Sequence, residues 1–208
     1  SYPLIMNITN DAVVISNQFY VIRLSPDSGQ IMTWLNLKNG VLFDYQDPRN
    51  LTESERVINR TPDVFCVGKP WSHAFDWQKG EYENKNIVGP IFIETIRCGK
   101  MHFADEFSCN VRYRFLATQP EVFVTSVVSV NKDAKIMALR NGGICFSPSL
   151  FTHVAWPENN AKLSIVSLKS TLGNDAGAPA LSRTSTDTPW IAFYNSEKKY
   201  GFAIHTIK

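Results

Sequence analysis

Hydrophobic and polar residues alternate with a period of two along most of this chain. In residues 108–116, SCNVRYRFL, the apolar positions fall on one face of an extended segment and the polar positions on the other. The apolar face carries Cys109, Val111, Tyr113 and Phe115, and the polar face carries Asn110, Arg112 and Arg114. Because the side chains of a strand point alternately to its two faces, this pattern predicts a half-buried β-strand with Tyr113 in the core.

Similar alternating segments recur and are separated by turn sequences such as SPDSG at 25–29 and NKD at 131–133. The predicted strands cover residues 13–16, 19–24, 30–35, 90–96, 108–116, 122–130, 135–140, 162–168, 190–194 and 201–207. No long segment keeps a helical period, and strands do not alternate with helices. The sequence therefore predicts an all-β fold, an antiparallel β-sandwich with few or no helices, in a single domain over residues 1–208.

Two long segments interrupt this pattern. Residues 44–88 are polar and rich in turn residues but carry Trp71, Trp77 and Tyr82. Residues 171–189 are small and polar with almost no apolar content. Because long loops on a rigid β scaffold commonly carry the functional site, we expect 44–88 to be a loop that forms a site. We expect 171–189 to be a flexible lid or an exposed excursion.

Composition and charge narrow the classes of partner. The 208 residues are 44% hydrophobic, enough for a full core, and the formal net charge of +2 is spread without long runs of like charge. A polyanion-binding stripe is therefore absent, so no nucleic acid partner is expected. No apolar run is long enough to cross a membrane, so no membrane partner is expected either. The compartment and the oligomeric state are not determined by the sequence, with a secreted or periplasmic location as the working expectation.

Four cysteines lie far apart, without the spacing of a zinc or redox motif: Cys66, Cys98, Cys109 and Cys145. Cys98 and Cys109 flank a predicted hairpin and are the plausible disulfide pair. The alternative, that all four are buried free thiols, remains open. We expect no metal and no cofactor.

Several segments taken together resemble one superfamily. The order FYVIRLSPDSGQIMTWLNL, GPIFIETIRCGK, FSCNVRYRFLATQPEVFVTSVVSV, RNGGICFSPSLFTHVAWP and KKYGFAIHTIK resembles the β-supersandwich of the galactose mutarotase-like superfamily. That group includes aldose epimerases and the sandwich domains of several polysaccharide lyases and glycoside hydrolases. The resemblance spans most of the chain and implies a supersandwich fold with a carbohydrate ligand. THVAW at 152–156 is similar to the segment from which mutarotases supply a catalytic histidine, here His153.

One departure from that superfamily bears on the reaction. Its mutarotases place a catalytic glutamate beyond the segment that resembles YGFAIHT at 200–206, whereas the last acidic residue here is Glu197. The complete pair of histidine and glutamate is not visible, so simple mutarotation is not the expected reaction.

The two candidate proton carriers are His153 and His73, since imidazole titrates near neutral pH. Trp156, close to His153, offers a flat face for a pyranose ring, and both residues can equally be ordinary parts of the core. His73 lies in KPWSHAFDW, where Trp71 and Trp77 are candidate stacking surfaces and Asp76 is a candidate to hold the imidazole tautomer. The alternative is a loop that its two tryptophans pin to the sheet.

Two arginines are candidate ligands for an acidic sugar, because guanidinium matches a carboxylate with two hydrogen bonds. Arg140 precedes the pair Gly142 and Gly143, which permits a close approach of backbone or ligand. Arg112 shares a strand face with Arg114, where the alternative is a solvated face paired with Glu94, Glu106 or Glu121.

These residues lead to one hypothesis and one alternative about function. The hypothesis is a carbohydrate-active enzyme of lyase or epimerase type that acts on a sugar or an oligosaccharide, with uronic acid among the candidates, by histidine acid/base chemistry. The alternative is a non-catalytic carbohydrate-binding sandwich domain of a larger enzyme. Both expect a mono- or oligosaccharide ligand, and the step from fold resemblance to function is analogy.

Overall fold

The computed structural model describes residues 3–45, 56–78, 80–147, 149–158, 162–168 and 189–205, and there it is an all-β protein. Every pair of neighbouring strands is antiparallel, and the named helix is the short 3-10 helix η2 (Ala74–Asp76). The predicted all-β antiparallel class is therefore confirmed. The expected lid at 171–189 lies outside the described residues, except for its last position.

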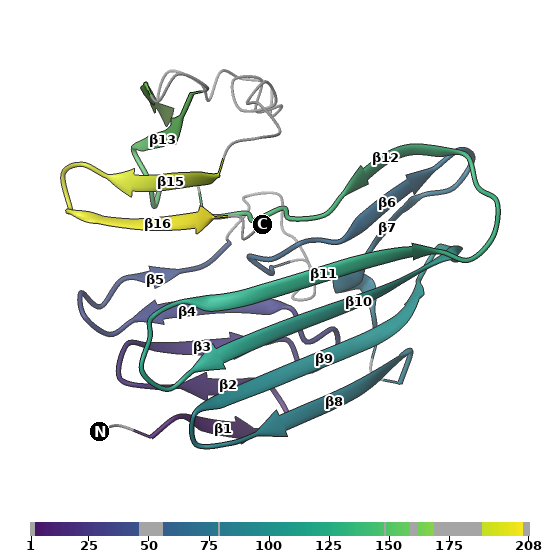
Figure 1. The fold of residues 1–208 in the computed structure, drawn as a ribbon, viewed down its shortest axis with the longest axis horizontal. Helices are drawn as coiled ribbons and strands as arrows, with labels where there is room; N and C mark the ends of the chain where they lie inside the picture. Colours follow the sequence, from purple (N-terminus) through teal and green to yellow (C-terminus); the bar gives the residue numbers. More distant parts are fainter. Residues whose placement is uncertain are drawn as a thin grey trace. The chain divides into compact units, whose positions relative to one another are not determined.

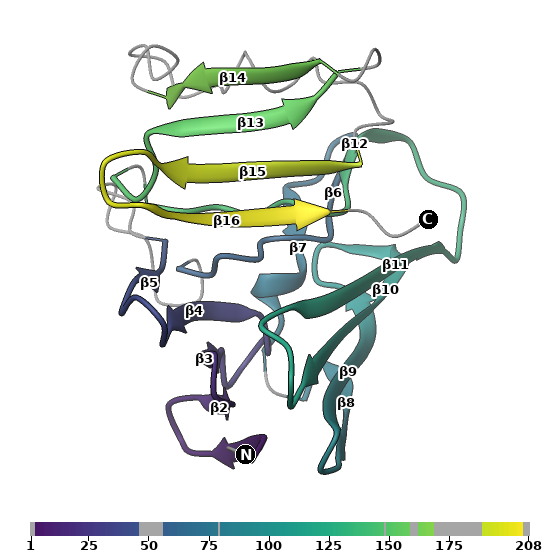
Figure 2. The same ribbon diagram turned by 60° about the vertical axis from the view of Figure 1, so that its left-hand side comes forward.

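The chain divides into two compact units, Ser1–Ser147 and Pro148–Lys208. This division does not show whether the two units fold as one domain. The single domain expected over residues 1–208 therefore stays a prediction. Figures 1 and 2 label the strands of each unit.

Three antiparallel sheets build the first unit. The five-stranded sheet follows chain order: β1 (Ile5–Ile8), β2 (Val13–Ser16), β3 (Tyr20–Leu24), β4 (Ile31–Asn36) and β5 (Leu42–Phe43). The four-stranded sheet has the order β11 (Val122–Val130), β10 (Ala104–Leu116), β9 (Phe92–Met101) and β8 (Tyr82–Val88). The three-stranded sheet has the order β12 (Ile136–Arg140), β6 (Asp63–Cys66) and β7 (Trp71–His73).

One sheet builds the second unit. Its spatial order is β14 (Leu163–Ser167), β13 (His153–Pro157), β15 (Trp190–Asn195) and β16 (Tyr200–His205). Within this unit Phe151 packs against Phe193, with ring centroids 5.8 Å apart, and the carbonyl of Leu150 accepts a hydrogen bond from the Tyr200 hydroxyl (2.6 Å).

The core of the first unit lies between the five-stranded and the four-stranded sheets. Tyr20 and Ile22 from β3 and Val111 and Tyr113 from β10 are fully buried in one apolar cluster. The alternation predicted for residues 108–116 is confirmed, since every second side chain of β10 enters this cluster. Asn17 joins the two sheets, because its side-chain amide donates to the carbonyl of Leu116 (2.7 Å).

A buried arginine in this core was not anticipated from the sequence. Arg97 on β9 is 1% exposed, donates to the carbonyl of Ser28 (2.5 Å), and lies with its guanidinium 4.8 Å from the ring centre of Tyr113. Gly29 makes room for it, because a Cβ there would lie 2.6 Å from Cδ of Arg97. Gly29 also has φ +63°, a conformation that glycine adopts without steric cost.

The expectation that 44–88 is one long loop is wrong over its described second half. This part contains β6, β7, η2 and the whole of β8. Val64 and Cys66 of β6 are buried in the core, and this burial accounts for the short strands despite the many turn residues around them. Some of the polar residues that suggested a loop are buried in the strands, among them Asp63 and Ser72.

All four cysteines are free thiols, so of the two alternatives left open by the sequence the Cys98–Cys109 disulfide is not formed. The reason is register: Cys98 lies opposite Asn110, and Cys109 lies opposite Gly99. Since neighbouring positions of a strand point to opposite faces, the two thiols project from opposite sides of the sheet. Cys109 enters the core, whereas Cys98 is half-buried on the outer face.

We expect iodoacetamide at pH 8 to alkylate Cys98 in the native protein and to leave Cys109 unmodified. Burial raises the pKa of the Cys109 thiol to about 12, so the reactive thiolate is scarce at this pH. Peptide mass spectrometry after labelling measures both sites, and labelling in urea provides the control in which both react. Protection of both thiols until a reductant is added would instead indicate a disulfide.

Candidate functional site

Three side chains form one row across the three-stranded sheet of the first unit. The register places Arg140 of β12 opposite Asp63 of β6, and Asp63 opposite His73 of β7. Because directly opposite residues project from the same face, the three functional groups meet although their positions in the sequence are far apart. Two of them, Arg140 and His73, are site residues that the sequence predicted from separate segments.

Asp63 holds this row together. Its carboxylate accepts a hydrogen bond from Nε of Arg140 (2.9 Å), lies 2.6 Å from Nη2 of the same guanidinium, and lies 3.2 Å from Nδ1 of His73. The Asp63 side chain is 2% exposed, whereas that of Arg140 is 57% exposed. A buried carboxylate is therefore covered by one half-exposed cation and one imidazole.

Asp63 is placed to orient the imidazole of His73. An ionised carboxylate only accepts hydrogen bonds, so a hydrogen bond between these two groups requires the imidazole proton on Nδ1 and leaves the lone pair on Nε2. The sequence assigned this orienting role to Asp76, and the structure gives it to Asp63. Asp76 instead accepts a hydrogen bond from the backbone N–H of His73 (3.0 Å) at the start of η2.

Aromatic rings flank the row on the same face of the sheet. Phe65 lies opposite Trp71, and their rings stack with centroids 5.0 Å apart. The Trp71 ring is also nearly parallel to the imidazole of His73 (5.9 Å), and the guanidinium of Arg140 lies 4.3 Å from its centre. Trp71 is half-buried by these contacts, so part of its surface remains for a ligand.

The two glycines after β12 anchor this sheet to the neighbouring backbone. The N–H groups of Gly142 and Gly143 donate to the hydroxyl of Thr61 (2.9 and 2.8 Å), two residues before Asp63. A Cβ at Gly143 would lie 2.8 Å from Cγ2 of Thr61. The close approach that the sequence expected here is thus made by the side chain of Thr61.

Arg112 lies on a different sheet and makes no described contact with this row. Its Nε is 3.8 Å from Oε1 of Glu94, and Nε and Nη2 of Arg114 are each 3.0 Å from the same oxygen. Of the two alternatives for this strand face, the structure shows the pairing with Glu94. Arg112 and Arg140 therefore belong to two separate clusters.

The expectation that Trp77 is a stacking surface for sugar is wrong. Its side chain is 0% exposed, its Nε1–H donates to the carbonyl of Lys100 (2.7 Å), and its ring stacks on Tyr82. A ring with no exposed surface offers no face to a ligand. Trp77 is a core residue, consistent with the alternative that the tryptophans pin this segment to the sheet.

His153 and Trp156 belong to the second unit, and the row of Asp63 belongs to the first. Nδ1 of His153 lies 2.8 Å from the hydroxyl of Thr152, and its ring stacks on Tyr194 with centroids 5.2 Å apart. The regular register of β13 puts His153 and Trp156, three positions apart, on opposite faces of the sheet. The two residues therefore cannot contact a ligand on one and the same face of this sheet, and their separate roles as proton carrier and stacking surface stay predictions.

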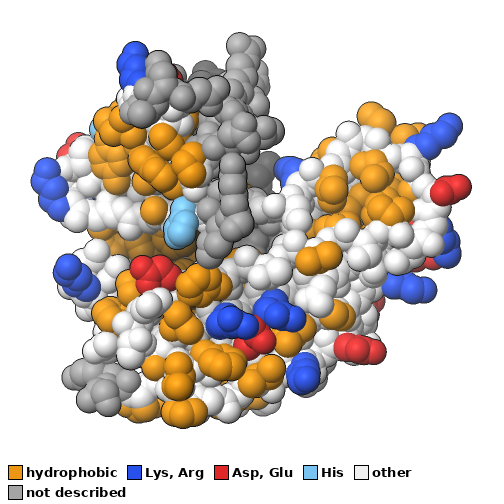
Figure 3. All heavy atoms as spheres, in the orientation of Figure 1, with side chains coloured by type: hydrophobic (Ala, Val, Ile, Leu, Met, Phe, Trp, Pro, Cys, Tyr) orange, Lys and Arg blue, Asp and Glu red, His pale blue; other side chains and the backbone are white. Residues whose placement is uncertain are grey.

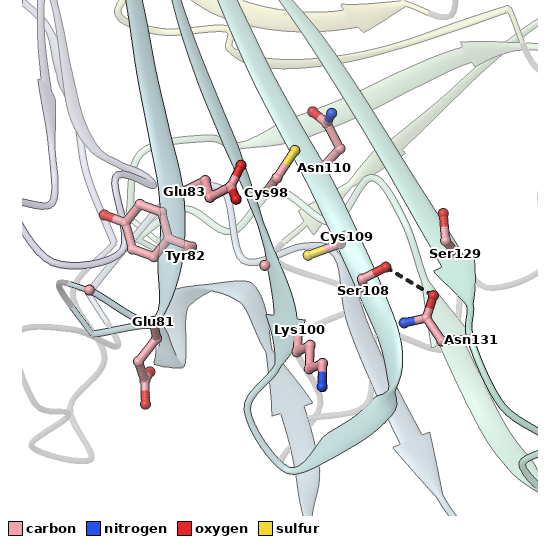
Figure 4. A pocket seen from close by; sticks show the side chains of 12 residues that line it. Glu81, Tyr82, Glu83, Cys98, Lys100, Ser108, Cys109, Asn110, Ser129 and Asn131 are labelled. Atoms are coloured by element: carbon pink, nitrogen blue, oxygen red, sulfur yellow. Dashed lines mark hydrogen bonds between the residues drawn. The ribbon is translucent and has the colours of Figure 1, made fainter.

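A shallow depression of about 810 Å³ lies on the four-stranded sheet, and none of the predicted site residues lines it. Figure 4 shows its polar lining, including Glu83, Cys98, Lys100 and Asn110 from β8, β9 and β10.

The described residues contain no group of three or more His, Cys, Asp or Glu side chains arranged for a metal ion. They also contain no helix long and apolar enough to cross a membrane.

Asp63 is the residue of this site that sequence reasoning missed. It sits in TPDVFC, where its alternation with Val64 puts it on the outward face of a short strand. The sequence signal that could have identified Asp63 is a carboxylate on this strand ten positions before His73.

Comparison of the chain with protein families, with curated proteins and with solved structures finds no match.

Proposed function

We propose that this protein acts on an acidic carbohydrate at the row formed by Arg140, Asp63 and His73. The observation that carries the proposal is the convergence on one buried carboxylate of a basic imidazole and a half-exposed guanidinium. A reaction that removes a proton next to a carboxylate needs these two groups, one to take the proton and one to bind the acid.

Arg140 is suited to bind the carboxylate of a uronic acid. It directs Nε and Nη2 to Asp63, and within the described part of the chain its Nη1 has no hydrogen-bond partner. A planar guanidinium held on one edge by Asp63 presents its remaining N–H groups in a defined direction. The same cation lies next to the negative charge that develops on the carboxylate when the neighbouring carbon loses its proton.

His73 is suited to take that proton. With Nδ1–H directed at Asp63, Nε2 is the basic atom, and the carboxylate stabilises the imidazolium that forms. Loss of the proton from the carbon next to the carboxylate is the first step shared by elimination and by epimerisation at that carbon. The proposal therefore covers the lyase and the epimerase type.

The test is a screen of uronate-containing oligosaccharides, following the ultraviolet absorbance of unsaturated uronate for elimination and NMR for epimerisation. If turnover is found, we expect Arg140→Lys to raise KM for a uronate substrate about ten-fold, because Lys keeps the charge and loses the planar fork. The thermal unfolding midpoint checks that the variant is folded. An unchanged KM would remove Arg140 from the site.

One observation favours a second candidate, a non-catalytic carbohydrate-binding domain. The row lies on a sheet face, and the described depression is elsewhere, whereas enzymes usually enclose their substrate. This candidate predicts binding of the same acidic oligosaccharides, detected by NMR line broadening, with no product in either assay.

A further inference from the structure

The outer face of the four-stranded sheet carries a second cluster of charged side chains. The register places Ile96 of β9 opposite Arg112 of β10, and Glu94 of β9 opposite Arg114 of β10. The neighbouring core-facing positions of β10, such as Tyr113, are fully buried, so these four side chains project away from the core. Both guanidinium groups are directed at one oxygen of Glu94.

The charges in this cluster do not balance. Glu94 is one carboxylate with a side chain 5% exposed, and it faces two guanidinium groups that are 41% and 47% exposed. Arg114 makes the close contacts, with Nε and Nη2 each 3.0 Å from Oε1, whereas the closest contact of Arg112 is at 3.8 Å. One positive charge therefore remains uncompensated. It lies mainly on Arg112, whose hydrogen-bonding groups have no partner in the part of the chain that the structure describes.

The surroundings combine a further cation with apolar side chains. Lys85 of β8 lies opposite Ile96, and Phe123 of β11 lies opposite Arg114 with 37% of its surface exposed. The guanidinium of Arg114 also lies 5.4 Å from the ring centre of Phe92. Figure 3 shows basic side chains beside an acidic one, among hydrophobic side chains, on the face of the molecule over β9 and β10.

We propose that this face binds an acidic group of a glycan, with Arg112 as the residue that holds the anion. The mechanism is charge complementarity: a carboxylate or sulfate ester neutralises the second guanidinium, as Glu94 already neutralises the first. The exposed ring of Phe123 and the side chain of Ile96 provide an apolar surface for the C–H face of the sugar ring. Buried Glu94 holds the guanidinium of Arg114 through two close contacts, which leaves Arg112 beside it for the ligand.

A glycan fits this cluster better than a nucleic acid does. A nucleic acid backbone needs a stripe of cations that follows regularly spaced phosphates, whereas this sheet face offers Arg112, Arg114 and Lys85 together with the carboxylates of Glu94 and Glu83, on a chain with a net charge of only +2. A single acidic group per sugar, flanked by apolar ring carbons, matches one uncompensated charge beside an exposed aromatic ring.

The test measures Kd by titration of the full chain with three hexasaccharides, one uronate-rich, one sulfated and one neutral. We expect both acidic ligands to bind and Arg112→Gln to weaken them about ten-fold, the effect of losing one charge-assisted contact. Arg112 is the residue to change, because Arg114 retains the close contacts with Glu94 and the sheet should stay folded. A control variant, Lys38→Gln, removes the same charge from the turn between β4 and β5.

The proposal is overturned if neither acidic hexasaccharide binds. It is also overturned if Arg112→Gln and Lys38→Gln weaken the binding of the acidic hexasaccharides equally. Tighter binding of a single-stranded oligonucleotide than of the glycans overturns it as well. A preference between the uronate-rich and the sulfated ligand identifies the acidic group. The inference does not rest on the function proposed for the row of Asp63, because Arg140→Lys tests that row and leaves Arg112 unchanged.

Discussion

Replacing His73 by glutamine is expected to lower turnover of a uronate substrate about 10²- to 10⁴-fold, the usual effect of losing a general base. Glutamine is uncharged and of similar length, and its amide N–H can still donate to Asp63, so the sheet should keep its structure. What is lost is the basic Nε2 atom. Steady-state kinetics should show the loss in kcat with a small change in KM, because Arg140 rather than His73 binds the acidic group.

His102 provides a matched control for this variant. It also pairs with a carboxylate, with Nδ1 3.3 Å from Oε1 of Glu81, and it is outside the row of Asp63. His102→Gln should leave kcat unchanged. If His73→Gln keeps full turnover, His73 is not the base. If the unmodified protein binds acidic oligosaccharides without turnover and His73→Gln binds equally well, the protein is a binding domain.

Replacing Trp77 by alanine is expected to lower the free energy of unfolding by about 3–5 kcal/mol, the range for removing a large aromatic side chain from a core. The indole is fully buried, stacks on Tyr82 with ring centroids 5.1 Å apart, and donates to the carbonyl of Lys100. Alanine leaves a cavity and also removes the hydrogen bond to the carbonyl of Lys100. Urea denaturation, followed by circular dichroism, measures the change.

Two further variants separate the contributions at this position. Trp77→Phe keeps an aromatic ring but loses the hydrogen bond to Lys100, so it should cost less than Trp77→Ala. Trp71→Ala removes a half-buried ring from the face of the sheet and should also cost less. A loss below about 1 kcal/mol for Trp77→Ala would contradict its place in the core.

The alternation of apolar and polar residues predicted the structure correctly where a strand is long and half-buried. Alternation along 108–116 correctly put Tyr113 in the core and Arg112 on the outer face, because a strand has two faces and this one is half-buried. The pattern was less informative in 44–88, where β6 and β7 have only four and three residues and the longer β8 is polar and mostly exposed, without an alternating period. Their residues are extended because Val64 and Cys66 are buried beneath the neighbouring sheets.

The candidate site was predictable in its parts and not in its assembly. His73, Trp71 and Arg140 were identified by residue type, whereas the central residue, Asp63, was missed. Its importance comes only from the register that sets it between Arg140 and His73. Trp77 was assigned to the ligand because a tryptophan among polar residues looks alike whether its ring is exposed or buried.

The all-β class, the antiparallel alternation and the faces of the long strands could be inferred from the order of the amino acids, since these follow from interactions between neighbours along the chain. Which side chains meet depended on the tertiary structure. It brought Arg140 and His73 to Asp63, left Arg112 with Glu94, turned Cys98 and Cys109 to opposite faces, and buried Arg97. The physical reason is that strand pairing joins residues distant in sequence, and a shift of one residue in register would exchange the faces of every side chain.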